Sequence, residues 1–355
     1  MTALGAGEPS MQFGIFDHLD QKPEAPSRTL AARIEFIRAA EAGGFRGYHL
    51  AEHHGTPLGM ASSPSVFLAA VAQATSRLRI GPLVYLLPLY DPLRLLGEIC
   101  LLDQLSNGRL EVGVGRAISP IELSFYGVDE EMAVARSKEA LAVLRAGLTS
   151  ERLTFSGRYF NYRDVPLPMA PLQRPLPFWS ASMSEDGLIE AARAGMHTAA
   201  LGNIEMISTA VKTYRAAAER LKNDPLRQQF GVGVPLNGMY RMVLVAATDA
   251  DAERLARPAY LHWFGKLIKL WREHGIQAPM IGALDKFETA RAVGMLVCGS
   301  PARVTDELAA QIKATGVNYV LAQMAFGDLA HRDEMASLAL FVERVMPALP
   351  SPHSV

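Results

Sequence analysis

Short apolar runs typical of β-strands alternate with runs of helical periodicity along most of this chain. Residues 11–16 predict a first strand, and residues 28–43 follow with apolar side chains at helical spacing and a glycine stop. Alternation of this kind predicts a parallel sheet, and about eight units favour a single closed (β/α)8 barrel over an open doubly wound sheet. The further strands are predicted at 47–50, 78–87, 110–114, 178–181, 198–201, 240–246 and 317–322.

Three segments depart from this rhythm. Residues 151–176 predict a hairpin with a Pro-rich connector, inserted after the fourth βα unit. Residues 275–297 are interrupted by glycines and read as irregular. Residues 1–10 read as a disordered lead-in, and no linker divides the rest, so we expect one barrel domain over 11–350.

Charge and cysteine content exclude several classes of protein. The net charge of -1 over 355 residues creates no field that would attract nucleic acid or an anionic membrane. No apolar stretch is long enough to span a bilayer, and the N-terminal residues lack the features of a signal peptide. Cys100 and Cys298 lie far apart, which suggests reduced thiols in a cytoplasmic enzyme.

Two predicted helices, at 64–75 and 92–106, are apolar nearly all round. A barrel helix that faces water should carry a polar outer face, so these two helices predict a homodimer interface. Leu96 is expected to point outward there. The alternative is that the C-terminal segment or the hairpin covers them.

Two adjacent histidines follow the second predicted strand, at the end of the barrel where catalysis is expected. Successive residues of a strand face opposite sides, so only one of His53 and His54 should face the mouth, where a histidine suits proton transfer near neutral pH. Adjacent histidines lack the i, i+4 spacing of metal ligands, so we expect no metal. A purely structural role for both histidines stays open.

Two further segments offer an anion site at strand ends. Arg116 ends the glycine-containing run 111–117, where it could clamp a phosphate or form a surface ion pair. This run lacks the third glycine of a dinucleotide fingerprint, and the stretch 118–120 reads as non-helical. Residues 182–187 place hydroxyls at a helix start, which suits a phosphate, although Glu185 and Asp186 also suit a plain helix cap.

Four stretches, in order, resemble the bacterial luciferase-like flavin-dependent monooxygenases. They are AEHHG, the run LVYLLPLYDPLRLLGEICLLDQLSNGRLEVGVGR, GVNYVLAQM and FVERVMPAL, and the resemblance covers nearly the whole chain. It implies reduced FMN, molecular oxygen and a small organic substrate such as an aldehyde or ketone. A separate NAD(P)H:flavin reductase would supply the reduced flavin. Some relatives instead use a deazaflavin for hydride transfer.

The resemblance also implies roles for particular residues. His53 matches the active-site histidine that handles protons near the flavin, and Arg116 matches the arginine on the flavin phosphate. Trp263, next to His262, matches an indole that lies toward the flavin, and a non-proline cis peptide is implied at Leu83-Val84. The remaining implied contacts to the phosphate come from Met183, Ser184 and Gly187.

Departures from the family pattern limit what carries over. Gly115 stands where luciferase has a reactive cysteine, Met183 replaces an acid, and Gly202 falls where luciferase has a pocket tryptophan. Light emission and long-chain aldehydes are therefore not implied. Residues 264–296 match the position of the family's mobile lid. A deazaflavin-dependent dehydrogenase or reductase and a flavin-storing subunit without catalysis remain the alternatives.

Overall fold

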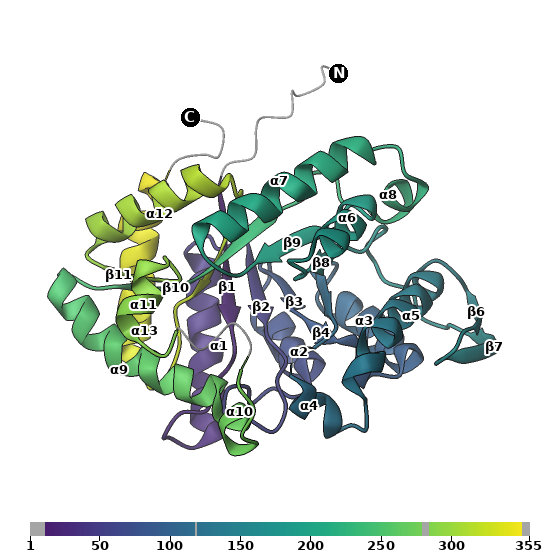
Figure 1. Cartoon of the computed structure of the whole chain (residues 1–355), viewed down its shortest axis with the longest axis horizontal. Coiled ribbons are helices and arrows are strands. Elements are labelled where there is room, and N and C mark those ends of the chain that lie inside the picture. The colour runs from purple at the N-terminus through teal and green to yellow at the C-terminus, as the bar shows by residue number, and fades with distance from the viewer. Residues whose placement is uncertain (1–10, 118, 279–283, 350–355) are drawn as a thin grey trace.

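The computed structural model describes residues 11–117, 119–278 and 284–349, and parallel strands surrounded by helices form its centre (Figure 1). The strands pair in the order β3-β2-β1-β12-β10-β9-β8-β5-β4, and a bridge between Ile80 and Leu110 brings the two ends together. Because the short strands β3 and β4 follow each other in the chain and share one position, the ring has eight positions, and the predicted barrel is confirmed. The ring strands are β1 (Gln12–Asp17), β2 (Gly47–Leu50), β3 (Arg79–Pro82), β4 (Tyr85–Leu86), β5 (Val112–Gly115), β8 (Phe178–Ser180), β9 (His197–Ala200), β10 (Asn237–Val245) and β12 (Tyr319–Gln323).

Proline, glycine and small polar residues set the ends of many helices. Asp91 caps α3, where its carboxylate accepts hydrogen bonds from the backbone N–H groups of Leu93 and Arg94. Gly316 ends α12 in the left-handed conformation that glycine adopts without strain. No helix among the described residues is long and apolar enough to cross a membrane. The helices are α1 (Pro26–Ala42), α2 (Pro64–Ala74), α3 (Pro92–Leu105), α4 (Pro120–Ser124), α5 (Glu130–Leu148), α6 (Glu185–Arg193), α7 (Ile204–Arg220), α8 (Pro225–Phe230), α9 (Asp249–Leu267), α10 (Lys269–Glu273), α11 (Phe287–Ala292), α12 (Pro301–Thr315) and α13 (His331–Leu340), with short turns at Leu87–Leu89, Phe341–Val345 and Met346–Ala348.

The predicted hairpin after the fourth βα unit is present. Strands β6 (Arg152–Ser156) and β7 (Asn161–Pro166) pair antiparallel, and Figure 1 shows them beside α5 at one edge of the molecule. Glu139 of α5 fixes the turn, because its carboxylate accepts the backbone N–H groups of residues 158–160.

Three details of the predicted strands and helices were wrong. The run 78–87 is not one strand, because it is divided between β3 and β4, and its uniform apolar composition does not mark the break. Residues 275–297 are not irregular throughout, since they contain α11 and the start of β11 (Leu296–Gly299), which pairs with the end of β10. The stretch 118–120 is not wholly non-helical, because Pro120 begins α4. The expected lead-in at 1–10 and residues 279–283 of the expected lid lie outside the described residues.

The two apolar helices α2 and α3 pack together with one side left open to solvent. Leu96 does not point outward as predicted: it is 2 % exposed and touches the position of Gly147 on α5. The outward positions are instead held by Val66, Leu101 and Leu105, which are 72 %, 47 % and 42 % exposed. An apolar outer surface is therefore present, but on neighbouring positions of the same helices.

A buried carboxylate gathers polar side chains from several barrel strands. Glu111, fully buried just before β5, pairs with the guanidinium groups of Arg46 and Arg79 and accepts a hydrogen bond from Nε1 of Trp179 (2.7 Å). His197 Nε2 lies 4.0 Å from the same carboxylate. Burial alone would raise the pKa of Glu111, but Arg46 and then His197 outweigh it and hold the pKa well below its usual range.

Candidate active site

The residues predicted for the site follow the carboxyl ends of parallel strands, so they meet at one rim of the barrel. His53 comes after β2, Leu83 after β3, Arg116 after β5 and Ser184 after β8. In barrels of this kind the loops after the strands build the catalytic face. Trp263 reaches the same face from α9 and is buried there beside His18, which follows β1.

His53 is held by a carboxylate that the sequence analysis missed. Its Nδ1 lies 3.2 Å from Oε1 of Glu122, and Oε2 of the same carboxylate accepts the backbone N–H of His54 (2.8 Å). We assign the proton of neutral His53 to Nδ1, because the carboxylate is an acceptor. That leaves Nε2, which no hydrogen bond within the described chain engages, as a proton acceptor.

His54 has a different environment. Its Nε2 donates to Glu52 (2.7 Å), and its Nδ1 accepts from the hydroxyl of Tyr126 (2.7 Å). His54 is 6 % exposed, and both of its ring nitrogens take part in hydrogen bonds. Of the two histidines named by sequence, His53 is therefore the one with a ring nitrogen left for chemistry.

A second histidine lies beside His53. The His18 and His53 rings are 5.5 Å apart between centroids, and Nε1 of Trp263 donates to Nδ1 of His18 at 3.4 Å. Burial, and then the nearby His53, lower the pKa of His18 well below its ordinary value, so its imidazole is neutral at pH 7. The sequence did carry a signal for it, since His18 comes immediately after β1, closer to its strand than His53 is to the end of β2.

The next feature of the rim is the break between β3 and β4. The peptide bond Leu83-Val84 is cis, as the resemblance predicted. Glycines of β5 allow the close approach there: a Cβ on Gly113 would lie 2.3 Å from the carbonyl oxygen of Pro82, and one on Gly115 would lie 2.4 Å from a methyl group of Val84. Larger residues at these two positions would therefore displace the edge of β3 and β4.

Potential anion ligands come from β5 and the start of α6. Arg116 is exposed, and no acidic side chain in the described ranges pairs with it. Ser184 caps α6 by accepting the N–H of Gly187, and its hydroxyl lies 3.1 Å from that of Ser182. A Cβ on Gly187 would lie 2.0 Å from the Ser182 hydroxyl oxygen, so glycine keeps this turn compact. Met183 instead packs against the main hydrophobic core.

The chemical nature of these residues fits a bound flavin mononucleotide. A free guanidinium and hydroxyls at a helix N-terminus are groups that bind a phosphate. The apolar edge at Leu83 and Val84 and the indole of Trp263 suit a flat aromatic ring. Glu185 and Asp186, which oppose an anion, are exposed in the first turn of α6. No group of three or more potential metal ligands occurs in the part of the chain that the structure describes.

The end of α9 is tied to two loops of the rim. The Lys266 ammonium lies 3.1 Å from carboxylate oxygens of both Asp20 and Asp328, which follow β1 and β12. His262 adds a contact of 2.8 Å to Asp328 and is itself mostly exposed. Trp263 is thus held in place by its neighbours on the same helix.

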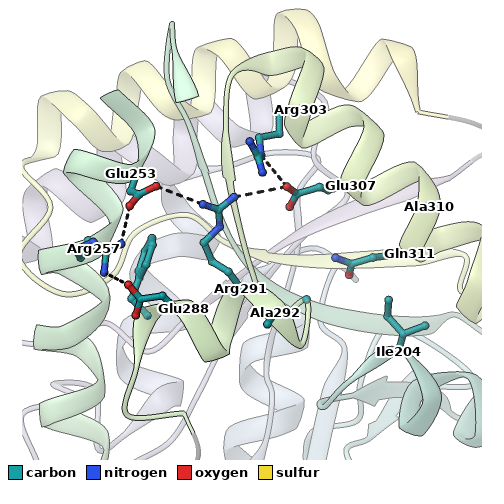
Figure 2. A pocket seen from close by; sticks show the side chains of 12 residues that line it. Ile204, Glu253, Arg257, Glu288, Arg291, Ala292, Arg303, Glu307, Ala310 and Gln311 are labelled. Carbon is teal, nitrogen blue, oxygen red and sulfur yellow. Dashed lines mark hydrogen bonds and ion pairs between the residues drawn. The ribbon is translucent and has the colours of Figure 1, made fainter. Parts of the chain in front are cut away.

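A hollow between α9, α11 and α12 contains none of the predicted site residues (Figure 2). Figure 2 shows Arg291 between Glu253 and Glu307, at 3.5 and 3.7 Å. Arg257 and Arg303 are likewise paired with acids. Because these arginines are already paired, the hollow offers an anion no free cation among its described lining residues.

Two curated relatives match this chain over nearly its whole length. An uncharacterized protein, y4wF, of Sinorhizobium fredii is 38% identical over 320 residues, covering 90% of this chain and 92% of that protein. The oxygenase component of a flavin-dependent trigonelline monooxygenase from Acinetobacter baylyi is 25% identical over 355 residues, covering 95% of each.

Two solved structures share the fold. The oxygenating constituent of 3,6-diketocamphane monooxygenase from Pseudomonas putida, in complex with FMN, superposes with a TM-score of 0.77 at 20% identity, covering 96% of this chain and 100% of that one. A coenzyme F420-dependent tetrahydromethanopterin reductase from Methanopyrus kandleri gives 0.68 at 20% identity, covering 96% and 99%. The family model described as luciferase-like monooxygenase matches residues 11–319, and the chain therefore belongs to that family.

Proposed function

We propose that this protein is an FMNH2-dependent monooxygenase that uses molecular oxygen to oxidise a small organic substrate such as an aldehyde or ketone. The observation that carries the proposal is the His53–Glu122 pair, which leaves an unprotonated Nε2 on the rim that also bears Arg116, a guanidinium that pairs with no acid among the described residues. Membership of the luciferase-like family and an FMN-bound protein of the same fold support it. One barrel domain over 11–350 would hold the whole site.

The residues of the chain divide the work between binding and proton transfer. Arg116 and Ser184 would bind the phosphate of the flavin, and the backbone at Leu83-Val84 would contact its ring. Reduced FMN, when bound, supplies the electrons that activate oxygen. His53 accepts or returns a proton at Nε2, and Glu122 fixes its tautomer and stabilises the imidazolium that forms. Residues 264–296, which match the position of the family's lid, would exclude water from the site.

A separate flavin reductase is the partner that this proposal requires. The run 111–117 lacks the third glycine of a pyridine-nucleotide fingerprint, which supports delivery of reduced flavin by another protein. Two similar proteins bear names that describe an oxygenase component or an oxygenating constituent, which supports the same division of labour. Turnover with an added reductase and a panel of aldehydes and ketones tests the proposal. Flavin binding without any oxidation would favour a flavin-storing subunit.

The second candidate is a deazaflavin-dependent dehydrogenase or reductase on the same scaffold. It is favoured by the similarity in fold to the F420-dependent reductase. Parallel titrations with FMN and with coenzyme F420 separate the candidates. Tighter binding of F420, with hydride transfer and no oxygen consumption, would replace the first proposal.

Replacing Arg116 with alanine should weaken FMN binding by about 1.5–3 kcal/mol, because a charge-assisted contact to the phosphate is lost. Riboflavin lacks the phosphate and should bind the wild type and the variant equally. Fluorescence titration with both flavins measures the difference. Arg158, which lies on the hairpin and packs on Tyr159, provides a control variant whose loss should change neither affinity. Unchanged FMN affinity in Arg116→Ala would remove Arg116 from the site.

The exposed apolar face of α2 and α3 leads us to propose a homodimer. Leu101→Glu places a charge on this face, which should disfavour burial against a second copy and give a monomer in light scattering. Leu261 on α9 is similarly exposed at 45 %, so Leu261→Glu is the matched control and should leave the dimer intact. A wild type that is monomeric at micromolar concentration would contradict the proposal.

A further inference from the structure

The His18 and His53 rings lie beside each other at the catalytic rim of the barrel, but their Nδ1 atoms have opposite hydrogen-bonding roles. Nδ1 of His18 accepts from Trp263, so the proton of its neutral imidazole is assigned to Nε2. Nδ1 of His53 faces the Glu122 carboxylate, so its free Nε2 is an acceptor. The pair therefore presents one neutral donor and one acceptor, with ring centroids 5.5 Å apart.

Side chains behind His18 keep its ring in this orientation. Phe16 packs edge-on against it with centroids 5.0 Å apart, and Trp263 lies at 5.8 Å. Gln323, fully buried at the end of β12, lies near His18, and its Oε1 accepts a hydrogen bond from the hydroxyl of Tyr240. Nε2 of Gln323 has no partner among the described residues, so it is a second neutral N–H beside His18.

We propose that His18 is a specificity-determining residue of this site, whose Nε2–H donates a hydrogen bond to an uncharged oxygen of the organic substrate. This inference rests on the proposed function and deepens it. A neutral imidazole can donate to a carbonyl oxygen without transferring a proton to it. Burial, together with the neighbouring His53, disfavours the imidazolium, and an anionic group would enter among aromatic rings without a countercharge. The site should therefore bind a carbonyl group more tightly than a carboxylate at this position. It should also bind a carbonyl group more tightly than a hydrocarbon, which leaves the Nε2–H donor unpaired.

The tautomer of His18 can be tested directly, without any flavin. Nitrogen-15 NMR of the full-length protein, with His18→Gln used to assign the signals, should show His18 neutral and protonated at Nε2 at pH 7. A proton on Nδ1, or an imidazolium at this pH, would overturn the proposal.

The binding preference is tested with acetophenone, ethylbenzene and benzoate, which share one skeleton and differ at the polar group. Titrations follow tryptophan fluorescence, and Trp263→Phe identifies the contribution of the indole beside His18. We expect acetophenone to bind wild type roughly fivefold to a hundredfold more tightly than ethylbenzene, because ethylbenzene leaves a buried donor unpaired, with benzoate weakest. Equal binding of the three, or no binding of acetophenone, would overturn the proposal.

Two variants of His18 separate donation from packing. His18→Phe keeps a ring but has no donor, so its preference for acetophenone should disappear. His18→Gln can place an amide N–H near the position of Nε2 and should restore part of the preference. A preference that survives in His18→Phe would overturn the proposal even if that variant is less stable. FMN affinity is measured on the same samples. If wild type does not bind FMN but still prefers acetophenone, the proposed function is wrong and the role of His18 as a donor stands.

Discussion

Replacing His53 with alanine should lower the rate of substrate oxidation by ~10²–10⁴, the usual contribution of a positioned acid–base residue. The flavin affinity should stay near that of the wild type, because the contacts expected for the phosphate come from Arg116 and Ser184. Rapid mixing of the variant with reduced FMN, oxygen and substrate measures the oxidation step, and fluorescence titration measures the affinity.

Variants of Glu122 and His54 test whether the loss of oxidation rate comes from His53 itself. Glu122→Gln keeps an amide near Nδ1 of His53 but removes the charge that stabilises the imidazolium, so it should lose part of the rate. His54→Ala should chiefly reduce stability, because it frees the buried Glu52 and the Tyr126 hydroxyl from their shared partner. An active His53→Ala together with an inactive His54→Ala would show that the wrong histidine was chosen.

The second large effect is expected on stability. Glu111→Ala should lower the free energy of unfolding by about 3–5 kcal/mol, because it leaves the Arg46 and Arg79 charges without their buried partner. Trp179 also loses the acceptor of its Nε1–H. Urea denaturation of the two proteins measures the difference. Glu219→Ala breaks the exposed pair with Lys222 and should change stability little.

The pH dependence of the Glu111 effect has a definite sign. The pKa of Glu111 in the folded protein lies below its usual value of 4.5, so the ionised carboxylate stabilises the fold above that value. The stability difference between wild type and Glu111→Ala should therefore be constant from pH 8 to pH 5 and shrink only in more acidic solution. If the difference in unfolding free energy already falls between pH 8 and pH 6, the titration of a group other than Glu111 is responsible.

Periodicity was enough to predict the barrel, because each βα unit repeats the same two signals over a long chain. Periodicity did not predict the structure correctly where a segment is short or is apolar throughout. The strand Leu296–Gly299 has four residues between glycine-rich stretches, and the run 78–87 is apolar on both sides of its break. The direction of Leu96 was wrong because α3 is apolar nearly all round, so its sequence does not tell the inner face from the outer one.

The site could be predicted only where its residues stand at strand ends. His53 and Arg116 were found in this way, but Glu122 is 69 residues from His53 in the chain and lies on a one-turn helix that periodicity does not reveal. The choice between His53 and His54 could not be made from alternation, because β2 ends at Leu50 and both residues lie in the following loop. Only their partners, Glu122 and Glu52, distinguish them.

The contacts of Lys266 decide which part of the rim can act as a hinge. Because this ammonium bridges Asp20 and Asp328, the last turn of α9 is fastened to loops on neighbouring strands β1 and β12. If the residues after α9 move, the movement would therefore begin at Ile268, where α9 ends, and not at a point nearer β10. Trp263 lies before that point in the chain, so the indole beside His18 would keep its position in the site during such a movement.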